Sequence, residues 1–403
     1  MRQIKITGAL LMLAITGSLW SCGGASEQAE TETAPADLVI FAKEEVDITG
    51  EGADLPLDKL TLPEGFSIEV FAGNVPDARS LALGDKGTVF VGNRRQKKVY
   101  ALVDSDGDGK ADKRYTLASD LNMPNGVAFR DGDLYVAEVN RILRFPDIES
   151  NLESPGFEII YDQYPTETHH GWKFIAFGPD GKLYVPVGAP CNICESEDEI
   201  YASITTIDVD ADNPTPTVFA HGVRNTVGFT WHPTTNKLWF TDNGRDMMGN
   251  DTPECELNYA PEAGMHFGYP YWHQGDVKDP EFGDKRPNSE DFTAPAAKMG
   301  PHVAPLGLRF YTGSKFPATY QNNLFIAKHG SWNRDEKSGY QVTTVALDGT
   351  DKVASEKVFI EGWLDKASQE NWGRPVDVMV MPDGSMLLSD DQAGCVYRIT
   401  YKG

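Results

Sequence analysis

The chain has 403 residues and carries 60 acidic against 36 basic side chains, a formal net charge of −24 at pH 7. Such a balance argues against nucleic acid or an anionic membrane surface as a partner, because both repel a strongly acidic protein. The 39 glycines, 25 prolines and 10% aromatic residues are typical of an all-β domain with many turns.

The N-terminal segment predicts an export signal with a lipid anchor. Arg2 and Lys5 precede an apolar run (9–20) that is too short to span a bilayer. The run ends in Leu-Trp-Ser-Cys, which places Cys22 where a bacterial lipoprotein carries its acylated cysteine. The alternative is an ordinary signal peptide with a chance cysteine. We expect residues 1–22 to be a lipoprotein signal peptide, and the protein to reside in the periplasm or at the outer membrane, held only by Cys22.

Residues 23–55 are rich in Glu, Thr and Ala and contain little that could form a core. This composition predicts a flexible tether. The remaining residues, 56–403, are expected to form one long β domain.

A repeat settles the expected architecture. A turn of Gly, Asp, Pro or Asn precedes an aliphatic or aromatic strand at six places: 88–92, 133–137, 182–186, 237–241, 323–327 and 385–389. Four short strands with their turns need about 40 to 45 residues, so each interval accommodates one blade. Amphipathic helix patterns are lacking between the units, which argues against a parallel βαβ sheet. The sequence predicts an all-β, six-bladed β-propeller whose strand 66–71 joins the last blade and closes the ring.

The interval between the fourth and fifth repeats contains an insertion, 242–302. It is rich in Gly, Pro, Tyr, Trp and His. Long loops in compact domains are usually functional or disordered, and the aromatic content here favours an ordered cap on one face.

Four cysteines remain besides Cys22, an even number that suits two disulfides in an exported chain. Three pairings are possible, and the favoured one joins Cys191 to Cys194 and Cys255 to Cys395. Half of a zinc site or a redox pair is the alternative for Cys-Asn-Ile-Cys, although zinc would need further ligands.

Polar clusters border the repeated strands, at the positions where propellers place functional residues around their central channel. They are 168–173, 221–225, 241–246 with 256–258, and 328–334 with 373–374. A lone histidine or arginine in such a place is often structural. The Gly turn with carboxylates in the third cluster suits a hard cation such as calcium.

Taken in order, these motifs resemble the soluble PQQ-dependent aldose and sorbosone dehydrogenase family over residues 62–401. The segment 189–194 leans toward the sorbosone dehydrogenase-like branch. The motifs are His170 ahead of Phe-Gly-Pro-Asp-Gly-Lys-Leu-Tyr-Val, His-Gly-Val-Arg-Asn (221–225), Asp-Asn-Gly-Arg-Asp (242–246), Lys328 and Gly-Arg-Pro-Val-Asp-Val (373–378).

The resemblance implies a quinoprotein that oxidises an aldose or sugar aldehyde at C1, with PQQ and Ca²⁺ as cofactors and an external electron acceptor. His170 matches the general base, for which a neutral imidazole is suitable near pH 7. Arg224 and Asn225 match residues that hold the quinone, and the arginine steadies negative charge that develops on it.

The remaining matched residues concern the cofactors. Asn243 belongs to the turn beside the quinone, and the backbone carbonyls of Gly244 and Arg245 match the calcium ligands. Lys328 and Arg374 match the cations that pair with the quinone's carboxylates. The chain departs from the glucose-oxidising members at Ala189, Val376 and Cys255, which replace an acidic residue, an arginine and an aspartate.

A second calcium site is predicted separately. Asp104, Asp106, Asp108 and Asp112 fit the spacing D-x-D-x-D-G-x-x-D, and Tyr115 in the twelfth position excludes a full EF-hand. A plain Asp/Gly hairpin is the alternative.

Two other functions stay open at this point. One is a non-catalytic envelope propeller that binds carbohydrate or protein. The other is a calcium-dependent lactonase-like propeller, which would need a cage of Glu, Asn and Asp on its axis.

Overall fold

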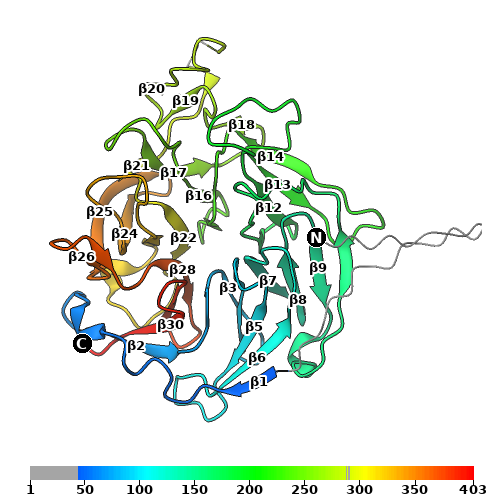
Figure 1. The fold of residues 1–403 in the computed structure, drawn as a ribbon, viewed down its shortest axis with the longest axis vertical. Helices are drawn as coiled ribbons and strands as arrows, with labels where there is room; N and C mark the ends of the chain where they lie inside the picture. The colour runs from blue at the N-terminus through cyan, green and yellow to red at the C-terminus, as the bar shows by residue number, and fades with distance from the viewer. Residues whose placement is uncertain (1–43, 287, 289–290) are drawn as a thin grey trace, which may run out of the picture. The chain divides into compact units, whose positions relative to one another are not determined.

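The computed structural model describes residues 44–286, 288 and 291–403. The predicted signal peptide with Cys22 lies outside the described residues, as does the tether up to residue 43. Within the described part, six sheets of four or five strands are arranged around a central axis (Figure 1). The chain is therefore an all-β, six-bladed β-propeller, as the repeats predicted.

The first three blades are built from the following strands, each given from the axis outward. Blade 1 contains β3 (Leu81–Leu83), β4 (Val89–Val91), β5 (Val99–Val103), β6 (Lys113–Ala118) and β1 (Glu44–Asp47). Blade 2 contains β7 (Gly126–Arg130), β8 (Asp133–Ala137), β9 (Ile142–Phe145) and β10 (Glu158–Tyr161). Blade 3 contains β11 (Ala176–Phe177), β12 (Leu183–Val187), β13 (Ser203–Ile207), β14 (Thr217–His221) and β18 (Met265–His266).

The second half of the ring follows the same plan. Blade 4 contains β15 (Phe229–Trp231), β16 (Leu238–Asp242), β17 (Glu254–Ala260) and β21 (Ala297–Pro301). Blade 5 contains β22 (Pro305–Phe310), β23 (Leu324–Lys328), β24 (Gln341–Asp348) and β25 (Lys352–Glu361). Blade 6 contains β28 (Pro375–Val380), β29 (Met386–Asp390), β30 (Cys395–Tyr401) and β2 (Phe66–Ala72).

Short elements complete the described chain. Two ribbons pair β19 (Trp272–His273) with β20 (Val277–Lys278) and β26 (Leu364–Asp365) with β27 (Glu370–Asn371). Three 3₁₀ turns cover Leu57–Lys59, Ile148–Ser150 and Ala318–Tyr320. No helix in this part of the chain has the length and apolarity to cross a membrane.

The six predicted strands are the second strands of the six blades. Residues of β12, β16, β23 and β29 are buried throughout. A strand buried on both faces needs no polar alternation, because neighbouring blades cover both of its sides. This explains why the repeats read as continuous apolar runs.

The ring is closed by a strand from the beginning of the domain. β2 pairs antiparallel with β30, with Phe66 opposite Tyr401 (Figure 1). The Phe66 ring packs edge-on against Phe316 and Phe359, with centroids 4.8 and 4.9 Å away. Such aromatic contacts add to the burial of apolar area, so the predicted closure is confirmed and its anchor is Phe66.

Residues 44–55 fall within the predicted tether, yet they pack on the propeller. β1 pairs with β6, and the Ile48 side chain is buried beside Phe71 and Ala111. One strand of backbone hydrogen bonds and one buried aliphatic side chain hold a segment whose composition alone predicts flexibility.

The insertion over 242–302 is ordered in its described residues, as expected from its aromatic content. β17 and β21 complete blade 4, and β18 adds a parallel strand to blade 3 through the pairs Ala220–Met265 and His221–His266. The insertion therefore ties two blades together beside the site described below.

The cysteines correct half of the predicted pairing. Cys191 and Cys194 form a disulfide, as predicted. Cys255 and Cys395 are both free and buried, so the Cys255–Cys395 bridge is wrong. Cys255 packs in the core cluster around Trp239, whereas Cys395 packs in the cluster around Trp363. The two thiols act as small apolar side chains in different blades.

Candidate functional site

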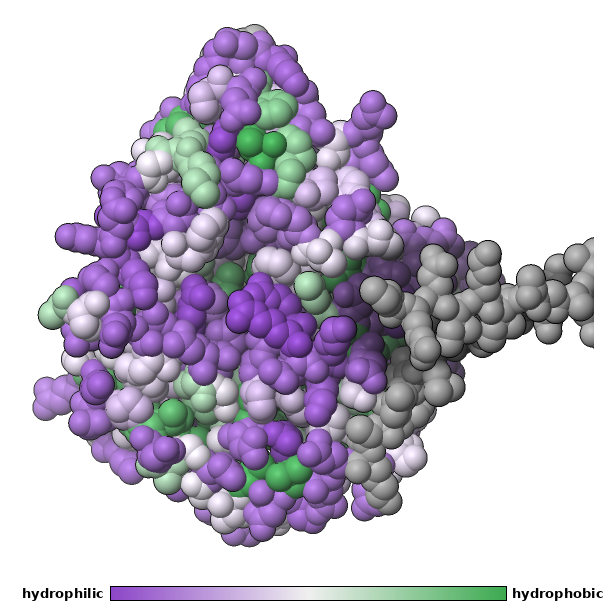
Figure 2. Space-filling model, viewed as in Figure 1, coloured by the Kyte–Doolittle hydropathy of each residue, from purple (hydrophilic) through white to green (hydrophobic). Residues whose placement is uncertain are grey.

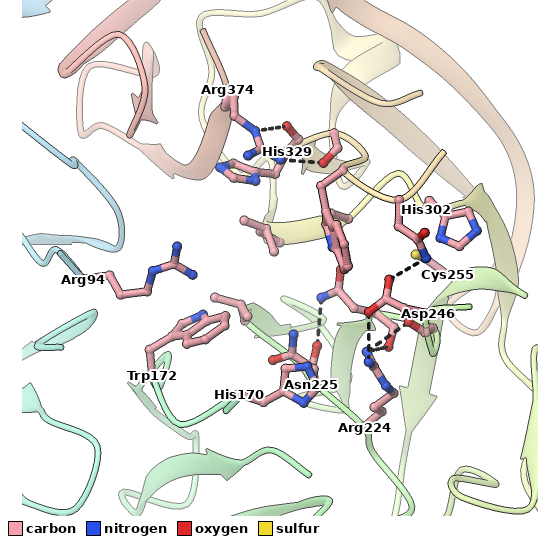
Figure 3. Close-up of a pocket in the computed structure, with 18 of the residues that line it drawn as sticks. Arg94, His170, Trp172, Arg224, Asn225, Asp246, Cys255, His302, His329 and Arg374 are labelled. Atoms are coloured by element: carbon pink, nitrogen blue, oxygen red, sulfur yellow. Dashed lines mark hydrogen bonds and ion pairs between the residues drawn. The ribbon is translucent and has the colours of Figure 1, made fainter. Parts of the chain in front are cut away.

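One end of the ring gathers the predicted polar clusters. The innermost and second strands of each blade are antiparallel, so the start of one and the end of the other lie at the same edge. Loops at this edge line a cavity of about 350 Å³ (Figure 3). On the face shown in Figure 2, strongly hydrophilic residues surround the centre of the ring.

His170 lies in the wall of this cavity, in the loop before β11. Its Nδ1 is 3.0 Å from the carbonyl oxygen of Ala189. A carbonyl only accepts, so Nδ1 carries the proton of the neutral ring and Nε2 presents a lone pair. Nε2 has no hydrogen-bond partner among the described residues. Burial lowers the pKa of His170 well below 6.5, and the nearby Arg224 lowers it further.

Ala189 thus performs an orienting role despite its apolar side chain. An acidic residue at this position would orient the ring through a carboxylate, whereas here the backbone carbonyl does so. The His170 backbone has a φ of 50°, and neighbouring His169 packs with its ring 4.2 Å from the His170 ring. The hydrogen bond to the Ala189 carbonyl therefore sets the orientation of the His170 imidazole.

Arg224 is buried beside His170 in the same part of the wall (Figure 3). Its side chain donates to the carbonyl oxygens of Asn192, Asn243 and Gly244 and to the side-chain oxygens of Asn192 and Asp246. A guanidinium has five N–H donors, and all five are therefore used. The Arg224 guanidinium is therefore held in one position, with no N–H group left unbonded.

Asp242 fixes the backbone on which Arg224 sits. Its two carboxylate oxygens accept the backbone N–H groups of Arg224 (2.8 Å) and Asn225 (2.6 Å). The Asn243 side chain donates to the Asn225 carbonyl at 2.8 Å. Burial raises the pKa of Asp242 to about 6. Asn225 and Asn243 both line the cavity, and their role in holding a cofactor stays a prediction.

The backbone carbonyls of Gly244 and Arg245, which the sequence predicts as calcium ligands, lie among side chains that already form hydrogen bonds and ion pairs. The Gly244 carbonyl accepts Nη1 of Arg224 at 3.0 Å. The Arg245 side chain turns to Asp279 (2.5 Å) and Glu281 (3.0 Å). A cation at Gly244 would lie beside a guanidinium, so the protein atoms alone favour calcium there only weakly.

Lys328 is not brought to the cavity. Its ammonium group binds Glu356 at 2.6 Å and the Met299 carbonyl at 2.7 Å, and it lies outside the cavity lining. Its predicted role as a carboxylate partner therefore has no support in the geometry, because its charge is already paired. Arg374, in contrast, lines the cavity and donates to the carbonyls of His329 and Gly330.

Three arginines in the lining were missed in the sequence: Arg79, Arg94 and Arg95. Arg79 is paired with Asp391 at 2.7 Å. Arg94 stacks over Trp172 at 4.4 Å, and its guanidinium has no hydrogen-bond acceptor among the described residues (Figure 3). Burial, with the charges of Arg79 and Arg95, lowers the pKa of Arg94 to about 10. The sequence did indicate these positions, because Arg94 and Arg95 follow a repeated strand in the same way as Lys328.

The charge of the cavity is opposite to that of the chain. Five arginines line it, and Asp246 is the single carboxylate among the described lining residues. A partly buried, unpaired guanidinium is costly unless an anion neutralises it. The lining therefore fits an anionic occupant, in a protein whose net charge is −24.

The second predicted calcium site lies in the hairpin between β5 and β6. Asp104, Asp106 and Asp108 place carboxylate oxygens within 4.8 Å of one another. Asp112 instead accepts the Ser105 backbone and hydroxyl groups. Calcium binding here stays a prediction.

A family model described as TrAA12-like matches residues 60–402. The chain belongs to the TrAA12-like family. An uncharacterized protein of Borreliella burgdorferi is 32% identical over 356 residues, 85% of this chain and 91% of that protein. The pyrroloquinoline quinone-dependent pyranose dehydrogenase of Coprinopsis cinerea is 23% identical over 86% of this chain, which matches 55% of that enzyme. The aldose sugar dehydrogenase YliI of Escherichia coli is 24% identical over 60% of this chain and 64% of its own length.

Solved structures agree on the fold. The calcium structure of the Trichoderma reesei family AA12 enzyme has a TM-score of 0.73 at 18% identity, over 85% of this chain and 97% of that chain. The holo PQQ domain of the Coprinopsis pyranose dehydrogenase has a TM-score of 0.70 at 17% identity, with the same shares. The chain is thus a distant homologue of PQQ-dependent sugar dehydrogenases.

Proposed function

We propose that the protein is a PQQ-dependent dehydrogenase that oxidises an aldose or sugar aldehyde at C1 and passes electrons to an external acceptor. The observation that carries this proposal is the unprotonated Nε2 of His170 in a cavity lined by five arginines. The names of the Coprinopsis and Escherichia coli relatives support the substrate class.

The residues present fit PQQ, a tricarboxylate. Arg94, Arg95 and Arg374 would hold its carboxylates, and Arg94 supplies the unpaired charge that such a ligand neutralises. Position 376 carries a valine, and the charge of Lys328 is already paired with Glu356, so neither residue supplies a free cation to the cavity. Arg94 and Arg95 of blade 1 would supply those cations instead. When bound, PQQ supplies the acceptor for a hydride.

The protein's own groups would perform the proton chemistry. Nε2 of His170 takes the proton of the substrate's C1 hydroxyl, and the Ala189 carbonyl holds the resulting imidazolium through Nδ1–H. Arg224, beside the base, would stabilise negative charge that develops in the cavity. Because Arg224 is already fixed, it needs no reorganisation during the reaction.

Calcium is proposed to bind together with the quinone and not to the protein alone. The described lining offers one carboxylate, Asp246, and Gly244, whose carbonyl accepts a hydrogen bond from Arg224. The carboxylates of the cofactor would supply the missing negative charge. A lactonase-like metal cage would need several acidic side chains on the axis, so the dehydrogenase is the better supported function.

The test is reconstitution. Purified protein is mixed with PQQ and calcium, and the quinone spectrum and aldose-dependent dye reduction are measured. His170→Ala should abolish turnover yet keep the quinone spectrum, because the base lies outside the arginine contacts. Asn151→Ala, a surface asparagine bonded to the Asp147 carbonyl, is the control and should keep full activity. Absence of quinone binding at micromolar PQQ would refute the proposal, and turnover by His170→Ala would remove His170 from its role.

We also propose that the enzyme is exported and lipid-anchored through Cys22. The support is the N-terminal sequence alone. Labelling of the expressed chain with a radioactive fatty acid, lost in Cys22→Ser, tests this anchor.

A further inference from the structure

A disulfide-closed loop from blade 3 packs against the wall of the cavity, through Asn192 and the lining residues Arg224 and Asp246. Cys191 and Cys194 are bonded to each other and enclose only Asn192 and Ile193. The Tyr269 hydroxyl accepts the backbone N–H of Cys194 at 3.1 Å and lies 3.5 Å from Sγ of Cys191. Asn192 is therefore held by a covalent bridge and by a residue of the insertion.

Asn192 binds both charged residues of the adjoining wall. Its carbonyl and its Oδ1 accept Nε (2.9 Å) and Nη2 (2.7 Å) of Arg224. Its side-chain amide also pairs with the backbone of Asp246, donating to the carbonyl at 3.0 Å and accepting the N–H at 2.8 Å. These four hydrogen bonds join the loop to the turn after β16.

Loss of the Asn192 side chain would leave Arg224 incompletely bonded. Arg224 is 4% exposed, so Nη2 could not simply turn to solvent. Its remaining partner on that nitrogen is Asp246, at the longer distance of 3.3 Å. A buried donor without an acceptor is unfavourable, and the guanidinium would shift toward another acceptor.

We propose that Asn192, clamped by the Cys191–Cys194 disulfide, is a positioning residue that fixes the Arg224 guanidinium at the cofactor pocket. This inference rests on the proposed function for the role of Arg224. The placement of Arg224 by Asn192, however, is a property of the protein without cofactor.

The catalytic test compares two variants of Asn192 in the PQQ- and calcium-loaded protein. Asn192→Ala should lower kcat about ten- to hundred-fold with the KM for the sugar nearly unchanged, because a displaced charge stabilises the transition state poorly. Asn192→Asp keeps the oxygen that accepts Nη2 but loses the donor to the Asp246 carbonyl, so it should recover most, not all, of the kcat lost in Asn192→Ala. Asn151→Ala, a surface asparagine bonded to the Asp147 carbonyl, is the matched control and should have no effect.

A second readout needs no cofactor. The charges that lower the pKa of His170 are those of Arg224 and His169. Displacement of Arg224 in Asn192→Ala should therefore raise the pKa of His170, measured by NMR titration of the cofactor-free protein. Asn151→Ala should leave that titration unchanged.

The outcomes separate the two proposals. If wild type does not bind PQQ, the proposed function fails, and a raised His170 pKa in Asn192→Ala still supports the positioning role. Unchanged kcat together with an unchanged His170 titration would overturn that role. Should Asn192→Ala not fold, the double variant Cys191→Ser with Cys194→Ser, which frees the loop but keeps Asn192, takes its place. It should move kcat in the same direction, and wild-type kcat in a folded double variant would overturn the clamp.

Discussion

At the scale of residues, the proposed chemistry depends on His170 as the base and on Arg94 as an unpaired cation. His170 is oriented by a carbonyl rather than a carboxylate, which fixes its tautomer without adding a negative charge beside it. A carboxylate neighbour would stabilise the imidazolium and raise the pKa of the base. The arrangement in this chain therefore gives a weaker base that stays available in mildly acidic solution.

This difference sets the expected pH dependence. The pKa of His170 is lowered below 6.5, so the ring is neutral at pH 6.5 and above and becomes protonated only at lower pH. The acidic limb of kcat/KM should therefore lie below pH 6.5, measured between pH 4.5 and 8 with the reconstituted enzyme. A limb centred above pH 6.5 would contradict the assignment of the base.

Substitution of Arg94 should weaken PQQ binding without lowering the thermal stability of the cofactor-free protein. Arg94→Gln removes a charge that burial disfavours, because the pKa of this group falls to about 10. The cofactor-free variant should unfold at the same or a higher temperature. Its PQQ dissociation constant should rise about ten-fold, since a carboxylate partner worth about 1.4 kcal/mol is lost.

The control for Arg94 is Lys357→Gln, which removes one positive charge from the exposed side of β25. It should change neither quantity. Equal PQQ affinity in Arg94→Gln and wild type would show that Arg94 does not hold the cofactor.

At the scale of elements, the packing of β2 stabilises the closed ring of six blades. Phe66 contacts Phe316 and Phe359 of the neighbouring blade as well as Tyr401 of its partner strand. It therefore links blades 5 and 6 as well as two strands of one sheet.

Phe66→Ala should lower the free energy of unfolding by about 2 to 3 kcal/mol, somewhat less than for a fully buried phenylalanine. Urea denaturation followed by tryptophan fluorescence measures this change. Val358→Ala, at a side chain 49% exposed on β25, should change it by no more than about 1 kcal/mol. Similar losses in the two variants would mean that the closure contributes little to stability.

At the scale of the whole molecule, blade count and closure could be predicted because each blade repeats one buried strand. The strand 385–389, for example, lies one residue from β29 as observed. The insertion's aromatic residues likewise indicated order. Local signals of this kind survive in a single sequence.

Side-chain pairing could not be predicted in the same way. Lys328 follows its strand as Arg94 and Arg95 follow theirs, yet Glu356 on β25 neutralises it. The Cys255–Cys395 bridge failed because the two blades that carry these residues bury each thiol separately. Both outcomes depend on contacts between distant segments, which spacing along the chain does not reveal.

The closure of the ring also has a consequence for the order of folding. The hydroxyl groups of Ser67 and Thr400 lie 2.8 Å apart on β2 and β30, although 333 positions separate them along the chain. Blades 2 and 5 consist of strands that follow one another along the chain, and the four inner strands of blade 3 do so too, whereas blade 6 must wait for its final strand to be synthesised. Long-range contacts of this kind form slowly because a large loop must close first. Until then β2 is an unpaired strand edge open to other chains, so aggregation during biogenesis should begin there.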